Sequence, residues 1–525
     1  MSIIKPAKDK IINSKKIIPP LGTSKKTENE RKINIDKKRS KTNFMNPPKS
    51  SILFYHPLVI VLIYLVIHLL LRISISETLQ VDDREQLFFA SELKLGYPMP
   101  QPPLYSWLSY FFFKIFGVNL TSLTFVKYIL IFLTFTYLYF SAKIIFKNNL
   151  FVNLTVFSYF LMPSFAWHMH QGFTHTVLLG LSISMTFFYI IKIQYKQNLI
   201  NYLFLGLSIG IGMLSKYSYF VFLILISLTV VLNKETRYKF FTNNFYLSLL
   251  TILVITLPHY YWLFDNWELI YSQAKERIIG GNNLYFFPLY FEFFKSSIGF
   301  LSPLIFVLLF KFNSIFLNHK GEKPSIEKFL DKFFLLLLIL SFLVFIFFDF
   351  KEVKVRWLHP VLMLFPFWIF LKFEKNYGST TPIFIKIFTL SAVIFSILIL
   401  SIRVAQLTIA PKFGYYSRIN VPIISAFESL PKEVIDEVGI IKSEDYFLGP
   451  HIVSFFSDKS VKIYNKSFNK KALKDKKNCL VMWDNDGYDD TVTKNMNNYD
   501  GKITKMVYDF EYTLFYRIED IETCK

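Results

Sequence analysis

The sequence has little cysteine and little charge, and each shortage excludes a class of protein. Only Cys479 and Cys524 occur among 525 residues. Neither a disulfide framework nor a thiolate metal site is therefore expected, and a single bridge between the two remains open. Charged residues make up 18% of the chain and hydrophobic residues 53%. With apolar runs of about 18 residues or more, this composition predicts a membrane protein and argues against a soluble one.

The formal net charge of +21 is concentrated in part at the beginning of the chain. Residues 1–50 hold 14 Lys or Arg and four acidic residues without strong apolar periodicity, which predicts a disordered basic tail. The tail is too polar for a secretory signal peptide, so the first apolar run is expected to be a retained anchor. The positive-inside rule places the tail in the cytoplasm. It lacks interleaved aromatic residues, which argues against nucleic-acid binding.

About eleven apolar runs predict a polytopic α-helical membrane domain over residues 51–407. They lie near residues 53–75, 121–146, 150–166, 173–192, 199–214, 217–232, 245–263, 287–311, 333–350, 358–372 and 383–407. An odd number of spans places the C-terminus outside. The connectors expected on the inner side are rich in Lys and Arg, as the positive-inside rule requires. They are residues 192–198, 233–244, 311–332 and 372–386.

Beyond about Leu407 the composition changes, and Gly, Pro, Asp and charged residues become frequent. The segment "KNCLVMW" predicts a buried strand followed by the turn "DNDGYDD", and "MVYDFEYTLFYRI" alternates as strands do. Residues 408–525 are therefore expected to form a small α/β domain on the outer face, since roughly 110 residues can support a core of their own.

Several basic residues fall on the outer side, where topology gives no reason for positive charge. Cations kept there against the bias are candidates for binding an anion, although snorkelling to lipid headgroups explains any one of them equally well. Arg356 is preferred over Lys354 as an anion ligand, because a guanidinium can bind two oxygens of one anion at once. The cations are Lys216, Lys275, Arg277, Lys351, Lys354 and Arg356.

The first outer loop begins with the acidic residues Asp82, Asp83 and Glu85, directly after the first span. Adjacent carboxylates repel, so in a partly desolvated cleft either one stays protonated or a cation, such as a divalent metal ion, binds between them. A single ionised carboxylate can act as a general base toward a hydroxyl group. The alternative is a helix cap without a chemical function, because Asp commonly begins helices.

The rest of this loop predicts two helices along the membrane surface with a stiff segment between them. Residues 104–116 are apolar at helical spacing but too short to span, and residues 86–95 are expected to form a shorter helix. Between them lie Gly96 and four prolines at positions 98 to 103, which exclude a regular helix. Such a loop can hold the acidic residues in one position.

The segments "DDREQLFFASELKLGY" and "PQPPLYSWL" resemble the membrane glycosyltransferases of the GT-C class, in the branch of the protein O-mannosyltransferases and lipid A aminoarabinose transferases. They are similar to bacterial members that add sugars such as galacturonic acid to lipopolysaccharide. "GMLSKYSYFVFL" resembles the Lys-containing turn of the family, "KVRWLHPVLMLFP" its late outer-face segment, and "SEDYFLGPHIVSFF" its C-terminal soluble part.

The resemblance implies an inverting glycosyltransferase of the bacterial inner membrane that faces the periplasm. Its donor would be a polyprenyl-phosphate-linked sugar, and its acceptor a lipid, a lipopolysaccharide or a protein. Asp82 would be the catalytic carboxylate. Asp83 or Glu85 would support it or share a divalent cation with it.

One departure from the family concerns the donor phosphate. Several relatives have Lys immediately before "PPL", where this chain has Gln101. Lys216, Arg356, or the pair Lys275 and Arg277 would then contact the phosphate in its place, because a phosphate leaving group requires cations.

The histidines of "WHMHQGFTH" also fall on the outer side. Without a nearby acidic residue, His168, His170 and His175 favour packing or substrate hydrogen bonding over metal ligation. His359, close to Arg356, is a candidate for substrate contact by its position.

The main alternative function is transport or flipping of a lipid-linked sugar. A transporter is expected to place ionisable residues near the bilayer midplane on broken helices, often in inverted repeats. The span centres of this chain are nearly all apolar and no repeat is visible, which favours the enzyme. A receptor whose outer domain binds a partner would leave the acidic loop unexplained.

Overall fold

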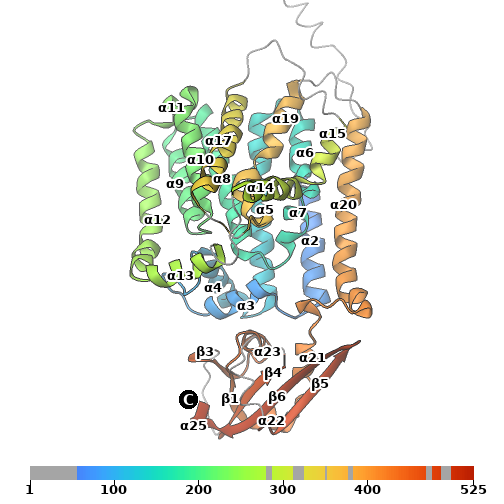
Figure 1. Ribbon diagram of the computed structural model, residues 1–525. Coiled ribbons are helices and arrows are strands. Elements are labelled where there is room, and N and C mark those ends of the chain that lie inside the picture. The colour runs from blue at the N-terminus through green and yellow to red at the C-terminus, as the bar shows by residue number, and fades with distance from the viewer. Residues whose placement is uncertain are drawn as a thin grey trace, which may run out of the picture. The chain divides into compact units, whose positions relative to one another are not determined.

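The computed structural model describes residues 56–278, 286–310, 324–348, 350, 352–375, 382–468, 476–485 and 498–524. The predicted basic tail, Lys351 and most of "DNDGYDD" lie outside these residues. The described chain is a set of helices followed by a small sheet (Figure 1). The predicted fold class, a polytopic helical protein with a small C-terminal α/β domain, is confirmed.

Six of the described helices are long and apolar enough to cross a membrane. They coincide with six of the predicted spans, and their lengths of 19 to 27 residues match the roughly 20 residues that a bilayer core requires. These helices are α2 (Pro57–Ile75), α5 (Leu120–Ile145), α8 (Thr174–Tyr195), α12 (Phe245–Asp265), α17 (Ser325–Phe347) and α20 (Pro382–Thr408).

Three further predicted spans are bent pairs of helices, so the described residues hold up to nine spans. In the first pair, the segment from α6 (Asn149–Ser158) through η2 (Tyr159–Leu161) bends by 70° into α7 (Pro163–Ala166) and η3 (His168–His170). The other two pairs bend by 103° and 49°. They are α10 (Tyr219–Leu232) with α11 (Lys234–Phe240), and η4 (Val355–Leu358) and α18 (His359–Leu362) with α19 (Phe365–Lys375).

The remaining two predicted spans differ more from expectation. Helix α9 (Leu199–Met213) is a shorter apolar helix of 15 residues. The predicted span 287–311 is not one helix, because α14 (Phe286–Leu301) ends before Pro303 and a separate α15 (Leu304–Leu309) follows. Proline has no N–H to continue a helix, which explains the break.

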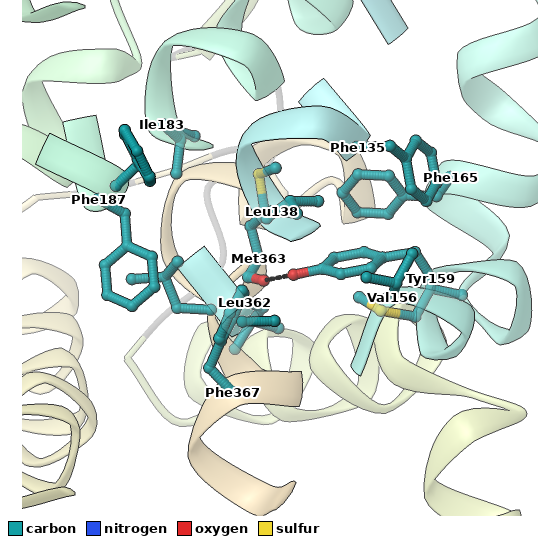
Figure 2. Packing of buried hydrophobic residues seen from close by; sticks show 14 of the residues in the cluster. Phe135, Leu138, Val156, Tyr159, Phe165, Ile183, Phe187, Leu362, Met363 and Phe367 are labelled. Carbon is teal, nitrogen blue, oxygen red and sulfur yellow. Dashed lines mark hydrogen bonds between the residues drawn. The ribbon is translucent and has the colours of Figure 1, made fainter. Parts of the chain in front are cut away.

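Helix α8 forms the centre of the helical core. Its most apolar stretch is 94% buried, and it packs against α5 and α9. Figure 2 shows part of this core, where the ring of Phe187 lies edge-on to that of Phe367 with centroids 5.1 Å apart. The hydroxyl of Tyr159 donates to the carbonyl oxygen of Met363 at 2.7 Å (Figure 2). Close packing of this kind fixes the helix ends that carry polar residues.

Two short helices follow α2, as predicted, but the first is shifted. Helix α3 spans Val81–Phe89 and α4 spans Leu104–Phe116, whereas the sequence predicts the first of them at residues 86–95. Gln80 is the N-cap of α3, so both aspartates lie inside its first turn. The expected range is wrong because it places the Asp pair before the helix.

The segment between α3 and α4 contains no helix, as the prolines predict, and it is bound to the bundle at both ends. At Gly96, an added Cβ would lie 1.9 Å from the ring of Trp262 on α12, so only glycine fits there. Beside it, His259 Nδ1 lies 3.0 Å from the carbonyl oxygen of Leu95. The N–H of Leu104 donates to the carbonyl oxygen of Leu214 at 3.1 Å. The loop is therefore held on α12 and on the end of α9.

The C-terminal part is built on a mixed six-stranded sheet in the order β3-β2-β1-β4-β6-β5. Strand β1 pairs in parallel with β2 and β4, and the other pairs are antiparallel. The predicted strands are present, with "KNCLVMW" in β4 and "MVYDFEYTLFYRI" divided between β5 and β6. The strands are β1 (Val438–Ser443), β2 (Ser460–Ile463), β3 (Lys466–Phe468), β4 (Asn478–Asp484), β5 (Gly501–Val507) and β6 (Phe510–Asp520).

Short helices connect and cover this sheet. Cys479 of β4 and Cys524 form a disulfide, which realises the single bridge left open by the sequence. The helices are η6 (Ala410–Phe413), η7 (Arg418–Asn420), α21 (Ile423–Phe427), α22 (Lys432–Glu437), α23 (Gly449–Phe455) and α25 (Ile521–Cys524), and the remaining helix of the bundle is α13 (Trp267–Ile278).

Candidate active site

Asp83 is buried between two cations. Its side chain is 2% exposed, and its two oxygens lie 3.3 Å from an Arg72 Nη and 3.4 Å from Lys127 Nζ. The N–H of Gln80 also donates to it at 3.4 Å, which caps α3. Burial opposes ionisation, but Lys127 and Arg72 outweigh it and hold the pKa of Asp83 below its usual value. Asp83 therefore joins α2, α3 and α5 as a structural anion.

Among the described residues, Asp82 has fewer hydrogen-bond and ion-pair partners than Asp83. The backbone N–H of Thr174 donates to Asp82 at 3.4 Å, and Gly172 packs against its Cβ. Burial raises the pKa of Asp82 above its usual value, and the negative charge of Asp83 adds to this effect. Lys127 and Lys216 act in the opposite direction. A carboxylate with a raised pKa and open hydrogen-bonding capacity has the properties of a general base.

Lys216 lies in the turn between α9 and α10, within electrostatic reach of Asp82. Its Nζ donates to Thr176 Oγ1 at 2.8 Å. Burial, together with the positive charge of Arg356, lowers the pKa of Lys216 to about 8. Arg356 is exposed on η4. The structure thus brings together three of the predicted site residues, Asp82, Lys216 and Arg356. They lie at the end of the bundle where α2 ends and α5 begins, and this end is called the site end below.

A hydrogen-bonded chain fixes the turn that carries Lys216. Ser106 Oγ donates to Gln86 Oε1 at 2.8 Å, which leaves the Gln86 amide nitrogen to donate to His175 Nε2 at 3.1 Å. With Nε2 as acceptor, His175 Nδ1–H donates to the carbonyl oxygen of Ser215 at 3.2 Å. Helices α3, α4 and α8 are thereby tied to the residue before Lys216. His175, one of the predicted histidines, has a positioning function in this arrangement.

His359 has a similar relation to Arg356. Its Nδ1 lies 3.1 Å from the carbonyl oxygen of Arg356, and its ring packs against Phe300 and Phe165. The other nitrogen, Nε2, is buried without a hydrogen-bond partner among the described residues. The histidine holds the backbone of η4 and leaves one ring nitrogen as an acceptor.

Among the described residues, neither Gln101 nor Lys275 bonds to Asp82. Glu85 lies one turn further along α3 and is partly buried. The Oε1 atom of Gln101 is buried and has no hydrogen-bond partner among the described residues. Lys275 is exposed on α13, and the side chain of Arg277 lies outside the described residues.

Sequence analysis missed four polar residues that lie inside spans near the site end. Arg72 and Lys127 bind Asp83, and Arg403 of α20 bonds to His68 Nδ1 and to the carbonyl oxygen of His170. The rings of His68 and His170 are stacked with centroids 3.8 Å apart. The signal was present in the sequence, because an ionisable residue inside an apolar span indicates a functional site.

The observed contacts do not fit a cation shared by the two aspartates. Both oxygens of Asp83 already face Arg72 and Lys127, so a metal ion would have to displace them. Within the described ranges, no group of three His, Cys, Asp or Glu side chains is arranged to hold a metal. We therefore derive no step through a metal ion.

Comparisons with known proteins agree with this architecture. Residues 100–262 match the family model described as dolichyl-phosphate-mannose-protein mannosyltransferase. The lipopolysaccharide core galacturonosyltransferase RgtB of Rhizobium johnstonii is 28% identical over 394 residues, which cover 74% of this chain and 78% of that protein. RgtA of the same organism, also a lipopolysaccharide core galacturonosyltransferase, is 25% identical over 407 residues, or 76% and 80% of the two chains.

The fold is similar to a solved structure of ArnT from Cupriavidus metallidurans bound to undecaprenyl phosphate. The TM-score is 0.55 at 10% identity, and the match covers 87% of this chain and 97% of ArnT. The apo structure of the same protein gives a TM-score of 0.53 over 88% and 97%. These matches confirm the resemblance expected from the sequence motifs: the chain is a glycosyltransferase with several apolar helices, and it is similar to membrane glycosyltransferases of the GT-C class.

Proposed function

We propose that the protein transfers a sugar, with inversion, from a polyprenyl-phosphate donor to a lipid or lipopolysaccharide acceptor. The arrangement of Asp82, Lys216 and Arg356 carries this proposal. It combines a carboxylate of raised pKa with two cations that face no competing carboxylate bond in the described structure. Transfer from a sugar phosphate requires these two components, a base for the acceptor and positive charge for the leaving phosphate.

In the proposed reaction, Asp82 accepts the proton of an acceptor hydroxyl group. The oxygen attacks the anomeric carbon as the bond from that carbon to the phosphate oxygen breaks, and the electron pair leaves with the polyprenyl phosphate. Lys216 and Arg356 stabilise the charge that develops on the phosphate. Direct displacement on the opposite face inverts the anomeric centre.

The two aspartates have different functions in this proposal. Asp83 holds α3 against Arg72 and Lys127, and Asp82, on the neighbouring position of the same helix turn, faces the reaction. Gln101 carries an amide and adds no positive charge. The phosphate contact therefore depends on Lys216 and Arg356.

The membrane and its sidedness belong to the same proposal. The Lys- and Arg-rich connectors favour an inner membrane orientation with the N-terminus in the cytoplasm. The site end and the C-terminal sheet would then face the periplasm. The similarity to lipopolysaccharide core galacturonosyltransferases supports a lipopolysaccharide acceptor.

Mass spectrometry of envelope glycolipids and glycoproteins from cells with and without the gene tests the function. A glycolipid that loses the mass of one sugar in the deletion, and regains it with the wild-type gene, is the expected result. Purified protein with the polyprenyl-phosphate donor should give a product of inverted anomeric configuration, measured by nuclear magnetic resonance. Unchanged glycan masses in all fractions, or retention of configuration, would contradict the proposal.

A further inference from the structure

A small cleft with both polar and apolar lining lies beside the site end, between α2 and α20. Arg72 and Arg403 line it from these two helices, and Gln80, Gln171 and Gln406 complete its polar wall. Arg72 bonds to Asp83 and to carbonyl oxygens at residues 76 and 78. Its charge is therefore matched within the protein.

The charge of Arg403 is not matched in this way. Its side chain is 9% exposed, and its bonds go to His68, to the carbonyl oxygen of His170 and to Tyr128. None of these partners is an acid, and the described residues place no carboxylate in an ion pair with Arg403. A buried guanidinium without an anion is costly, so an external anion in the cleft would be favoured.

The same pair of helices also lines an apolar pocket, which lies along the helices from the cleft. Tyr64 and Ile60 of α2, Phe160 of η2, and Ala392 and Ser396 of α20 are among its lining residues, and it exposes no polar surface. Tyr64 lies eight residues before Arg72, and Ser396 seven before Arg403. At 1.5 Å per residue, pocket and cleft are about 10–12 Å apart along the helices. The pair thus offers an anion site followed by an apolar site, here called the α2–α20 seam.

The seam reaches the vicinity of Asp82 without including the donor cations. Gln80 and Gln171, two walls of the cleft, adjoin the residues around Asp82, because an added Cβ at Gly172 would meet Gln80 Oε1 at 3.1 Å and Asp82 Cβ at 3.7 Å. The backbone oxygen of Gln171 accepts from Lys127 at 2.6 Å. Inversion requires the acceptor and the leaving phosphate to lie on opposite faces of the sugar. An entry separate from Lys216 meets this requirement.

We propose that the α2–α20 seam binds the acceptor lipid, with a phosphate of its headgroup beside Arg403 and one acyl chain in the apolar pocket. The inference rests on the proposed glycosyl transfer. It assigns Arg403 as the ligand of the headgroup phosphate and the apolar pocket as the site of an acyl chain.

Native mass spectrometry of the purified full-length protein tests the seam independently of transfer. The probe is a bis-phosphorylated, acylated glucosamine disaccharide, with undecaprenyl phosphate and phosphatidylglycerol as comparison lipids. Arg403→Gln removes the cation that is proposed to bind the headgroup phosphate. Ala392→Trp fills the apolar pocket and leaves the charged residues in place. Each is expected to weaken probe binding at least about tenfold, the scale of one lost charged or apolar anchor. Binding of undecaprenyl phosphate should change less than about twofold, since neither anchor serves it.

Two matched variants serve as controls. Lys412→Gln removes an exposed cation outside the cleft, and Ser401→Trp adds the same bulk to an exposed position of α20. Both should bind the probe as the wild type does. Unchanged probe binding in Ala392→Trp would overturn the inference, even if Arg403→Gln fails to fold.

The comparison lipids distinguish an acceptor site from a phospholipid site and from a donor site. Equal displacement of the probe by phosphatidylglycerol would show a site for bulk phospholipid, and loss of undecaprenyl phosphate binding in the seam variants would show a donor site. Either result overturns the assignment to the acceptor. Probe binding at the seam in a protein that transfers no sugar would contradict the proposed function instead, so the two failures are distinguishable.

Discussion

The two ends of the helical bundle differ in how their charged side chains are paired. At the far end, where α2 begins and α5 ends, Lys372 lies 2.8 Å from Asp331 and 3.6 Å from Glu327, and Lys375 pairs with Glu327. At the site end, Arg72 and Lys127 pair with Asp83, but Lys216 and Arg403 bond only to neutral partners among the described residues. Paired charges hold helices together, whereas buried cations that bond to neutral atoms can still bind a charged ligand. The difference indicates that the site end is built to receive anions.

The largest effect is expected from Asp82→Asn, which keeps the shape of the side chain and removes its basicity. Transfer should fall at least about a thousandfold, because a general base and its electrostatic contribution are lost together. A transfer assay with purified protein measures this loss. Asp265→Asn, an exposed acid at the end of α12, is the control and should keep full activity. If Asp82→Asn transfers sugar at the wild-type rate with an unchanged melting temperature, Asp82 has no part in the mechanism.

The second effect concerns pH and distinguishes Lys216 from a merely structural cation. Its pKa of about 8 means that the free enzyme loses this charge as the pH rises above 8. The profile of kcat/KM for the donor should therefore decline on the alkaline side. In Lys216→Arg the decline should move upward by at least about two pH units, because a guanidinium stays charged. An unshifted alkaline limb would show that another group titrates there.

Lys216→Gln should also move the acid limb of the same profile. Lys216 favours the ionised form of Asp82, so without its charge the pKa of Asp82 rises further. The acid limb, already above the usual carboxyl range, is expected to shift to higher pH, and kcat/KM near neutrality to fall about tenfold to a hundredfold. An unshifted acid limb would show that the charge of Lys216 does not influence the pKa of Asp82.

Most of the helical architecture could be predicted from the sequence, because long apolar runs and basic connectors are local signals. The prolines and Gly96 likewise predicted an irregular loop, and the structure adds that Trp262 makes glycine necessary there. The start of α3 was missed because Gln80 is an uncommon cap. The break at Pro303 was missed because the surrounding residues remain apolar on both sides.

The two aspartates could not be told apart by local sequence. Their difference depends on Arg72 and Lys127, which come from two other helices and meet Asp83 only in the folded chain. The resemblance to a known family selected Asp82, and the geometry gives a physical reason for this choice. Arg403 is 335 residues from His68 in sequence, so no spacing rule could have joined them.

Asp83→Asn should reduce stability more than any single change at the far end. It leaves the buried guanidinium of Arg72 and the ammonium of Lys127 without their anion. Removing one member of a buried ion pair costs about 3–5 kcal/mol. Thermal unfolding in detergent should show a clearly lower melting temperature, and transfer should fall only in proportion to the folded fraction. A melting temperature equal to that of the wild type would mean that Asp83 does not join α2, α3 and α5.

Glu327→Gln at the far end is the matched change with the smallest expected effect. Glu327 is as buried as Asp83, with 4% of its side chain exposed, but its partners Lys372 and Lys375 are 18% and 20% exposed. Water can reach these cations when the carboxylate is removed, and Asp331 still pairs with Lys372. The loss of stability, measured by the same thermal unfolding, should therefore be about 1 kcal/mol, with transfer unchanged. A loss of stability as large as that of Asp83→Asn would mean that solvent access to the cations does not explain the difference in stability cost between the two ends.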